Sequence, residues 1–218
     1  PFVDDDGKVY VTLCRFDFGS NLYIEEVAVK DGVITPKPET CKMILYPQTA
    51  YEVNGRGRTV EGGVPWKHGD YYYMIYAVGS YKLHYGQSYA VSKSIYGPYE
   101  KYEYNPFLVY NAAVDGPGDA VIMPSPDGKE LYLVYHQHNA IGTVSPRMTC
   151  IDRLKFVPNP DGGPDVLVTA GPSSTPQPVP SGTAEMPAAV TETKVTLTLG
   201  STAATSRWIP RRFPAAGA

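Results

Sequence analysis

The sequence predicts an all-β protein built from repeated antiparallel sheets, as in a β-propeller. Three segments, residues 6–13, 68–76 and 127–136, each combine a tight turn with a strand rich in aromatic and β-branched residues. Their turn glycines stand 62 and 59 positions apart, and a period of that length made of strands is typical of propeller blades. No segment shows a sustained 3.6-residue apolar period, so almost no helix is expected. Three unrelated hairpins or a Greek-key sandwich are the alternatives, because Asp-Gly turns are common.

The first unit is expected to contain three strands. Residues 2–13 are interpreted as a strand, an Asp-Gly turn and a second strand. Residues 22–29 are interpreted as the third strand, which ends at a turn at residues 31–32. Residues 36–47 are predicted to be irregular, apart from a short apolar run at residues 43–45.

The second and third units, residues 60–102 and 115–157, share the same order of features. Each begins with small residues and a carboxylate, Glu61 or Asp119, followed by a short apolar strand that leads into the turn. The predicted strands are residues 63–66, 71–78 and 88–92 in the second unit, and residues 120–123, 130–135 and 148–156 in the third.

The composition changes after residue 161. Residues 171–180 contain four prolines, which favours extended chain. The chain is therefore divided into a domain over residues 1–181 and an irregular, low-complexity tail over residues 182–218, which is expected to be disordered or foreign to the domain. One alternating stretch of this tail, residues 194–199, has the pattern of a strand.

The overall composition argues against two classes of protein. A net charge of −3 without a basic stripe argues against nucleic-acid binding, and the sequence contains no apolar run of about 18 residues that would span a membrane. The three cysteines, Cys14, Cys41 and Cys150, are widely spaced and odd in number, so free, partly buried thiols are expected. Because the first residue is not Met, both a secreted and a cytoplasmic location stay open.

Propeller geometry predicts that polar residues of the three units share one face. The innermost strand of each blade lines the central channel, and Glu61 and Asp119 would begin two of these strands at the face opposite the Asp-Gly turns. The loops after the second strands, residues 15–20, 79–86 and 136–146, would return to the same face. The residues expected around this mouth are Arg15, Tyr81, Lys82, His84, Tyr85, His136, His138 and Arg147.

These side chains suit a neutral polar ligand such as a sugar. An acid and a base on opposite sides of a glycosidic bond can cleave it, and Glu61 is the candidate catalytic acid; a solvated turn residue is the alternative reading of this glutamate. The candidate substrate-binding residues are Tyr81, Asp119, His136 and Arg147.

Two residues are candidates for metal binding. His138 shares a strand face with His136 because side chains alternate along a strand, which is compatible with a metal ligand. An exposed polar pair is the alternative, since two ligands alone do not make a site. Asp119 is compatible with a structural calcium ion in the central channel, because calcium prefers oxygen ligands. No cofactor is expected to be required.

Several stretches together carry a family resemblance. They are residues 1–10, 60–63, 71–76, 89–108, 125–136, 147–156 and 171–178. In order and spacing they resemble glycoside hydrolase family 43, the five-bladed β-propeller glycosidases, over roughly residues 1–181. The resemblance implies a five-bladed propeller from which this chain lacks the first blade.

The resemblance implies an enzyme, an O-glycosyl hydrolase that acts with inversion on α-L-arabinofuranosides or β-D-xylosides of plant cell-wall polysaccharides. The family uses a base on the first blade, a pKa-tuning Asp on the second and a general acid on the third. Only the acid carries over, to Glu61. The tuning Asp would directly precede Pro1, and the base would belong to the missing blade. Residues 4–6 are no substitute, because they lie in the turn on the far side of the sheet.

Two further expectations follow from the resemblance. Many relatives carry a channel His near the position of Asp119, often associated with a metal, and here the residue is Asp. The chain alone is expected to hydrolyse little or nothing, and its ligand would be an arabinose- or xylose-containing oligo- or polysaccharide. A non-catalytic carbohydrate-binding propeller is the first alternative, and a propeller scaffold for protein partners is the second.

Overall fold

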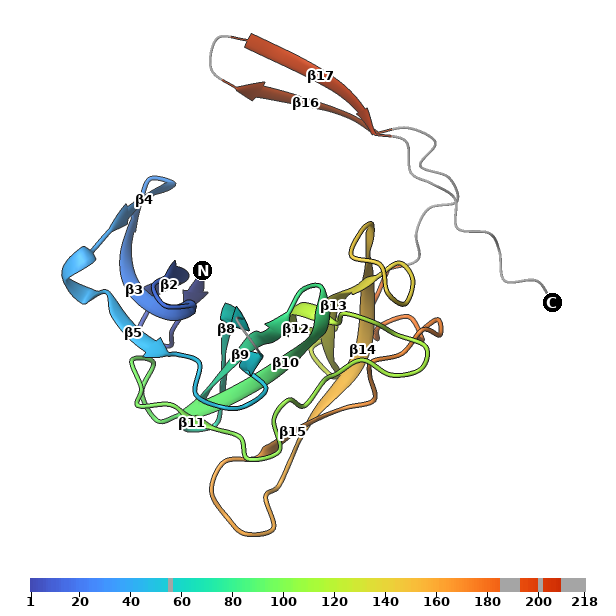
Figure 1. Cartoon of the computed structure of the whole chain (residues 1–218). Coiled ribbons are helices and arrows are strands. Elements are labelled where there is room, and N and C mark those ends of the chain that lie inside the picture. Colours follow the sequence, from blue (N-terminus) through green and yellow to red (C-terminus); the bar gives the residue numbers. More distant parts are fainter. Residues whose placement is uncertain (55–56, 185–192, 200–201, 209–218) are drawn as a thin grey trace. The chain divides into compact units, whose positions relative to one another are not determined.

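The computed structural model describes residues 1–54, 57–184, 193–199 and 202–208. The chain divides into two units, Pro1–Gly182 and Thr183–Ala218. The described residues form strands and loops with one short 3-10 helix, η1 (Pro38–Thr40), so the predicted all-β class is confirmed (Figure 1). No helix in this described part of the chain is long and apolar enough to cross a membrane.

The first sheet, drawn in blue in Figure 1, is antiparallel and contains both strands of the first predicted hairpin. Its strands are β1 (Phe2–Val3), β2 (Val9–Phe16), β3 (Ser20–Lys30), β4 (Val33–Pro36) and β5 (Lys42–Leu45). β1 to β4 pair in sequence order, and β5 pairs with β3. β4 is missing from the prediction because all four of its residues are exposed, so it shows no alternation of buried and exposed positions.

The second and third sheets are four-stranded antiparallel meanders, each paired in sequence order like a propeller blade. The second consists of β8 (Val60–His68), β9 (Tyr71–Ser80), β10 (Leu83–Ser92) and β11 (Glu100–Lys101). The third consists of β12 (Gly118–Pro124), β13 (Leu131–His138), β14 (Arg147–Val157) and β15 (Val166–Thr169). A short hairpin, β6 (Val53–Asn54) and β7 (Gly57–Arg58), precedes the second sheet. All strands predicted for residues 60–102 and 115–157 are present in these two sheets. The short strands β11 and β15 were not predicted.

The three repeated turns use glycine for its backbone conformation. Gly7, Gly69 and Gly128 have φ angles of 80°, 56° and 71°, in the left-handed region that L side chains adopt at a cost of roughly 1–2 kcal/mol. A Cβ added at any of these three positions would meet nothing within 4 Å. Conformation, and not lack of space, therefore requires glycine in these turns.

Replacing Gly69 by Ala is expected to destabilise the protein by about 1–2 kcal/mol, because Ala must adopt the left-handed conformation. Gly69→Asn is the matched control, since Asn tolerates this region better than Ala does. Urea denaturation measures both variants. Equal losses for Ala and Asn would show that the backbone conformation is not the cause.

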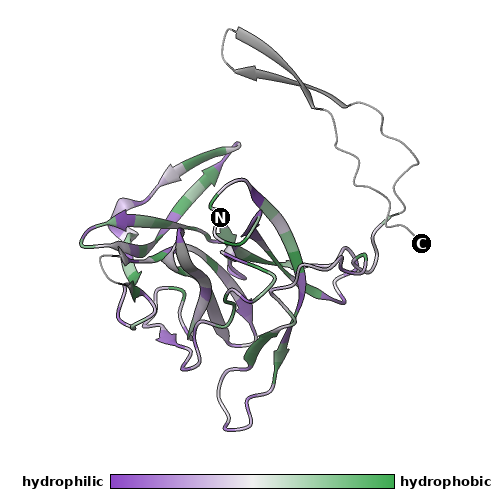
Figure 2. Cartoon of the chain, turned by 45° about the vertical axis from the view of Figure 1, so that its right-hand side comes forward, coloured by the Kyte–Doolittle hydropathy of each residue, from purple (hydrophilic) through white to green (hydrophobic). Residues whose placement is uncertain are grey.

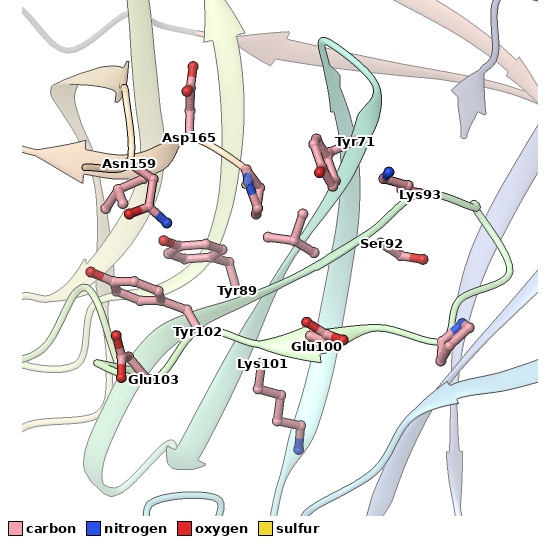
Figure 3. Close-up of a pocket in the computed structure, with 14 residues that line it drawn as sticks. Tyr71, Tyr89, Ser92, Lys93, Glu100, Lys101, Tyr102, Glu103, Asn159 and Asp165 are labelled. Carbon is pink, nitrogen blue, oxygen red and sulfur yellow. The ribbon is translucent and has the colours of Figure 1, made fainter. Parts of the chain in front are cut away.

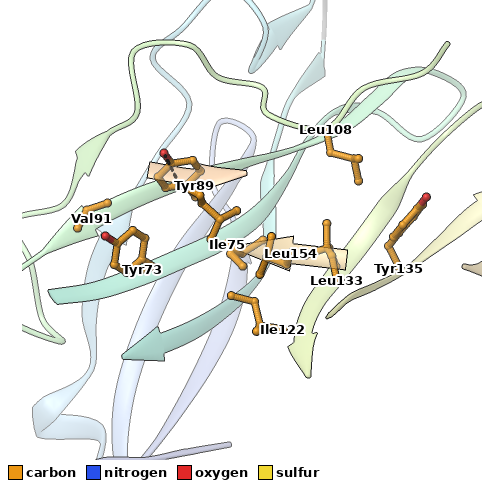
Figure 4. Packing of buried hydrophobic residues seen from close by; sticks show 11 residues of the cluster. Tyr73, Ile75, Tyr89, Val91, Leu108, Ile122, Leu133, Tyr135 and Leu154 are labelled. Atoms are coloured by element: carbon orange, nitrogen blue, oxygen red, sulfur yellow. Dashed lines mark hydrogen bonds between the residues drawn. The ribbon is translucent and has the colours of Figure 1, made fainter. Parts of the chain in front are cut away.

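Strand β9 is buried on both of its faces. Every residue from Tyr72 to Gly79 is buried, and period-two alternation sends successive side chains to opposite sides of the sheet. Tyr73 and Ile75 pack in the core shared with the third sheet (Figure 4), whereas Met74 and Tyr76 pack in the core shared with the first. Figure 2 shows hydrophobic and hydrophilic residues following one another along the strands. The second sheet is therefore the middle layer of this unit.

The chain after β15 is fixed to the third sheet by polar contacts. The backbone N–H and the hydroxyl of Ser173 donate to the carboxylate of Asp152, at 3.1 and 2.6 Å. The hydroxyl of Ser181 donates to Asp127 at 2.6 Å. Asp152 is fully buried, so this attachment belongs to the core and not only to the surface.

In the C-terminal unit, Thr183–Ala218, the described residues include an antiparallel hairpin of β16 (Thr193–Leu199) and β17 (Thr202–Trp208). The strand predicted at residues 194–199 lies within β16. Residues 185–192, 200–201 and 209–218 of the predicted low-complexity tail lie outside the described residues, so a domain boundary at residue 181 and a disordered tail stay predictions.

Candidate active site

Two β-bulges lie at corresponding ends of β8 and β12, the first strands of the second and third sheets. In β8 the pairing register shifts just after Glu61, and Gly62 has a φ of 61°. In β12 the register shifts around Asp119, which has a φ of 50°. Bulges re-aim side chains and are frequent next to active sites, and Asp is among the residues that best tolerate a positive φ. The two bulges direct both carboxylates into the same pocket.

This pocket has a volume of about 480 Å³ and is formed by residues of the three larger sheets of Pro1–Gly182 and of the loops next to them. Cys14 comes from β2, Tyr81 from the β9–β10 turn and Arg147 from the start of β14. The side chains that line it and carry the following argument are Cys14, Glu61, Tyr81, Tyr85, Asp119 and Arg147. The structure therefore brings together four of the residues that the sequence predicts for substrate contact: Glu61, Tyr81, Asp119 and Arg147.

Tyr85 joins the two carboxylates. Its hydroxyl lies 3.0 Å from Oε1 of Glu61 and 3.3 Å from Oδ1 of Asp119. Burial raises the pKa of Tyr85, and the nearby carboxylates of Asp119 and Glu61 raise it further, so the phenol stays protonated as a donor. The ring stacks on His136 with centroids 5.8 Å apart. Gly118 makes room for it, because a Cβ there would lie 2.1 Å from the Tyr85 ring.

The half-exposed carboxylate of Asp119 also lies near two nitrogen groups. Its Oδ2 lies 3.6 Å from Nδ1 of His136 and 3.9 Å from Nη1 of Arg147. Burial lowers the pKa of His136, and the charge of Arg147 lowers it further against the opposing effect of Asp119. His136 is therefore neutral near pH 7 and lies behind Tyr85, away from the pocket lining. Arg147 supplies the positive charge at the mouth.

These surroundings do not fit the calcium ion considered at Asp119. Calcium takes about six to eight oxygen ligands, whereas Oδ2 of Asp119 faces a guanidinium and an imidazole. Among the described residues, no group of three or more His, Cys, Asp or Glu side chains could hold a metal ion.

His138 turns into the protein instead of toward the pocket. Its side chain is almost fully buried, with Nδ1 3.5 Å from Oδ2 of Asp115. The ring lies over Gly116, where a Cβ would come within 2.3 Å of it. Within the described part of the chain, neither ring nitrogen has a hydrogen-bond partner. Metal binding by His138 stays a prediction. Among the described residues, His138 does not belong to any group of three or more His, Cys, Asp or Glu side chains that could hold a metal ion.

Two other residues expected at the mouth lie at its edge or away from it. Nη2 of Arg15 lies 3.2 Å from Sγ of Cys41, and its guanidinium covers the ring of Tyr23. Nζ of Lys82 lies 5.6 Å from the centroid of the Tyr81 ring, at the rim. The side chain of His84 lies outside the described residues.

Cys14 lines the pocket although the sequence shows it only as a free, partly buried thiol. Burial raises its pKa, so the thiol is protonated at pH 7. Thr12, two positions earlier in β2, bonds to the backbone of Gly63 in β8. The period-two alternation of β2 places Cys14 on that same face, and this alternation is the signal that could have found it.

The aspartates of the first turn lie at the opposite end of the sheet, as predicted. Asp4 accepts hydrogen bonds from Nζ of Lys67 at 3.1 Å and from the hydroxyl of Tyr72 at 2.6 Å. Lys67 stands six residues from Glu61 in β8, which corresponds to about 20 Å along a strand. Asp4 therefore cannot act in the pocket.

Meandering antiparallel sheets with carboxylates at matching ends of their first strands define a β-propeller with a polar pocket at one face. The model of the family described as glycosyl hydrolases family 43 matches residues 1–164. The chain belongs to glycosyl hydrolases family 43.

Solved structures agree with this fold. An endo-1,4-beta-xylanase from Bacteroides thetaiotaomicron is 28% identical with a TM-score of 0.69, over 78% of this chain and 57% of the other. A thermostable family-43 glycoside hydrolase is 29% identical with a TM-score of 0.71, over 84% and 60% of the two chains. The propeller prediction is confirmed, and the described residues hold three of its blades.

Two curated relatives are glycosidases. A xylan 1,3-beta-xylosidase from a Vibrio species is 32% identical over 113 residues, which are 49% of this chain and 19% of the relative. A beta-D-galactofuranosidase from Aspergillus niger is 37% identical over 159 residues, which are 71% of this chain and 41% of the relative. The chain thus spans less than half the length of either relative.

Proposed function

We propose that this chain carries the pocket of a glycosidase for α-L-arabinofuranosides or β-D-xylosides of plant cell-wall polysaccharides. The observation that carries this proposal is Glu61, held by a bulge in a pocket built from three sheets, with the Tyr85 hydroxyl 3.0 Å from its carboxylate. The names of two relatives, a xylan 1,3-beta-xylosidase and an endo-1,4-beta-xylanase, support a pentose polymer as substrate.

In the proposed reaction Glu61 is the general acid, and it gives its proton to the oxygen of the leaving sugar. The half-exposed carboxylate of Asp119 accepts hydrogen bonds from substrate hydroxyls, and Arg147 donates to them. Tyr81, at 47% exposure on the β9–β10 turn, offers an aromatic face to a sugar ring. His136 holds Tyr85 and Asp119 in position from behind.

Asp119 does not fit the role of the base in an inverting reaction. One carboxylate oxygen of Glu61 and one of Asp119 contact the same Tyr85 hydroxyl, at 3.0 and 3.3 Å. The distance between these two oxygens therefore cannot exceed the sum of the two contact distances. Inverting pairs are separated by about 6.5–9.5 Å, which leaves room for the attacking water. The described pocket therefore contains an acid without a base at that distance, and we expect slow turnover by the chain alone.

Sugar binding tests the proposed site without requiring turnover. A xylo- or arabino-oligosaccharide at 100 times its Kd is expected to stabilise the protein by about 2.7 kcal/mol, measured by urea denaturation with and without the sugar. Arg147→Ala should reduce this stabilisation, because it removes the contribution of binding in the pocket of Glu61. Arg153→Ala is the control, because Arg153 lies on the same strand but pairs with Glu130 at 2.8 Å. No stabilisation by either sugar would contradict the proposal and favour a scaffold for protein partners.

A non-catalytic carbohydrate-binding propeller is the second candidate. The observation that favours it is the spacing of Glu61 and Asp119, which leaves the acid without an inverting base. Both candidates predict sugar binding sensitive to Arg147→Ala. They differ in whether Glu61 affects the breaking of a glycosidic bond.

A further inference from the structure

A second hollow lies away from the pocket of Glu61, between the outer strands of the second sheet and the loop that leads into β15. Its volume is about 510 Å³, within the range of about 300–1,000 Å³ that is usual for small-molecule sites. Figure 3 shows Tyr89 and Tyr102 on one side of it, Tyr71 and Lys93 on the other, and Asn159 above.

The hollow lies at the opposite end of the second sheet from Glu61. In the pairing of β8 with β9, Glu61 stands opposite Ala77, whereas His68 stands opposite Tyr71. Tyr71 and Ala77 are six residues apart in β9, or about 20 Å along the strand. The two hollows are separate sites.

One wall of this hollow is a rigid aromatic surface. Tyr102 is partly exposed and stacks on Tyr89, with ring centroids 4.7 Å apart and planes 17° apart. Tyr89 is buried, and its backbone N–H and C=O both bond to the side-chain amide of Asn105, at 3.0 and 2.7 Å. The Tyr102 ring is therefore held in place before any ligand binds, and little rotational freedom would be lost on binding.

The polar groups of the hollow are of mixed charge. Nζ of Lys93 lies 5.6 Å from the centroid of the Tyr71 ring. Oδ1 of Asn159 accepts the backbone N–H of Asp161 at 3.1 Å, which leaves its amide N–H groups as donors. Among the described residues, the exposed Glu100 carboxylate has no hydrogen-bond or ion-pair partner. A donor, a cation and an anion around an apolar floor suit a neutral ligand with many hydroxyls better than an ion.

We infer that this hollow is a second binding site for a pentose-containing oligosaccharide chain. The apolar face of a sugar ring packs on Tyr102, and its hydroxyls bond to Asn159, Lys93 and Glu100. The choice of ligand rests on the function proposed above. A second point of attachment makes binding to a polymer tighter than binding through either site alone, because the second contact becomes intramolecular.

Calorimetric titration with xylohexaose and with arabinohexaose tests this inference. The unmodified chain is expected to bind about two equivalents of one of these sugars, and Tyr102→Ala to bind about one. Asn159→Ala should weaken that second site at least ten-fold. Tyr104→Ala is the matched control, because this residue is 70% exposed beside Tyr102 and outside the hollow. It should bind as the unmodified chain does.

Arg147→Ala separates the inference from the proposed function. If Arg147→Ala loses sugar binding while Tyr102→Ala and Asn159→Ala bind as the unmodified chain does, the second site is overturned and the proposed function stands. Binding that is lost only with Tyr102→Ala or Asn159→Ala supports the second site and contradicts the proposed pocket. Binding of neither sugar overturns both. Circular dichroism checks the folding of Tyr102→Ala, and if that variant is unfolded, Asn159→Ala decides the result.

Discussion

Replacing Glu61 by Gln is expected to abolish the cleavage of glycosides with poor leaving groups. A general acid contributes about 10²–10⁴-fold when the leaving oxygen must be protonated. The effect should be large for a xylo-oligosaccharide and small for a 4-nitrophenyl glycoside, because 4-nitrophenolate leaves without a proton. This dependence on the leaving group is a property of the acid and not of substrate binding.

Azide allows this measurement in a pocket without an inverting base, because this anion attacks without a base to activate it. Azide attacks the anomeric carbon, the bond to the leaving oxygen breaks, and Glu61 gives its proton to that oxygen. The product from a β-D-xyloside is the α-xylosyl azide, which NMR identifies. Glu39→Gln is the control, because Glu39 is exposed in η1. Equal losses for both leaving groups would contradict the role of Glu61, and no azide reaction at all would favour the non-catalytic sugar-binding propeller.

Replacing Lys101 by Met is expected to destabilise the protein by about 3–5 kcal/mol, the usual effect of breaking a buried ion pair. Nζ of Lys101 lies 2.7 Å from Oε2 of Glu52, whose side chain is only 2% exposed. Glu52 also accepts hydrogen bonds from Tyr76 and from the backbone of Gln48 and Thr49. Without Lys101, this carboxylate is left buried and uncompensated.

The double variant Glu52→Gln/Lys101→Met should recover much of this loss, because no buried charge then remains. Lys129→Met, which breaks an exposed pair with Asp127, should change the free energy of unfolding by about 0–1 kcal/mol. Urea denaturation measures all three variants. A loss for Lys101→Met no larger than that for Lys129→Met would contradict the importance of the buried pair.

The ion pair of Glu52 and Lys101 also makes the free energy of unfolding depend on pH, and the direction of this dependence can be predicted. Burial acts to raise the pKa of Glu52, but hydrogen bonds from Gln48, Lys101 and Thr49 outweigh it and hold the pKa below its ordinary value of 4.5. A lowered carboxyl pKa stabilises the folded state above about pH 4.5, and this stabilisation is lost as the pH falls through the folded-state pKa. The difference between the unmodified chain and Lys101→Met should therefore shrink in acid.

Much of the fold could be predicted because local physics decides it. Glycine at positive φ marks the repeated turns at Gly7, Gly69 and Gly128, and aromatic, β-branched residues mark the strands that follow. β4 and β15 could not be predicted in this way. β4 has no buried face, and β15 has only four residues, so neither shows a clear period.

The candidate site was predictable in its position but not in its contacts. Glu61 and Asp119 begin equivalent strands, so the repeat alone places them at one face. The bulges that aim them into one pocket depend on how β8 pairs with β9 and β12 with β13, which the sequence does not show. Tyr85 is one of 18 tyrosines, and nothing in its neighbours marks it as the one between two carboxylates. His138 faces inward because the chain at Gly116 folds over its ring.

The burial of β9 on both faces makes the middle blade interdependent with its neighbours. Met74 and Tyr76 contribute to one core, and Tyr73 and Ile75 to the other, so separating either flanking blade would expose a row of apolar side chains to water. Blades joined in this way cannot be exchanged between proteins one at a time, as modular repeats can. Grafting the pocket into another propeller would require the transfer of all three sheets together.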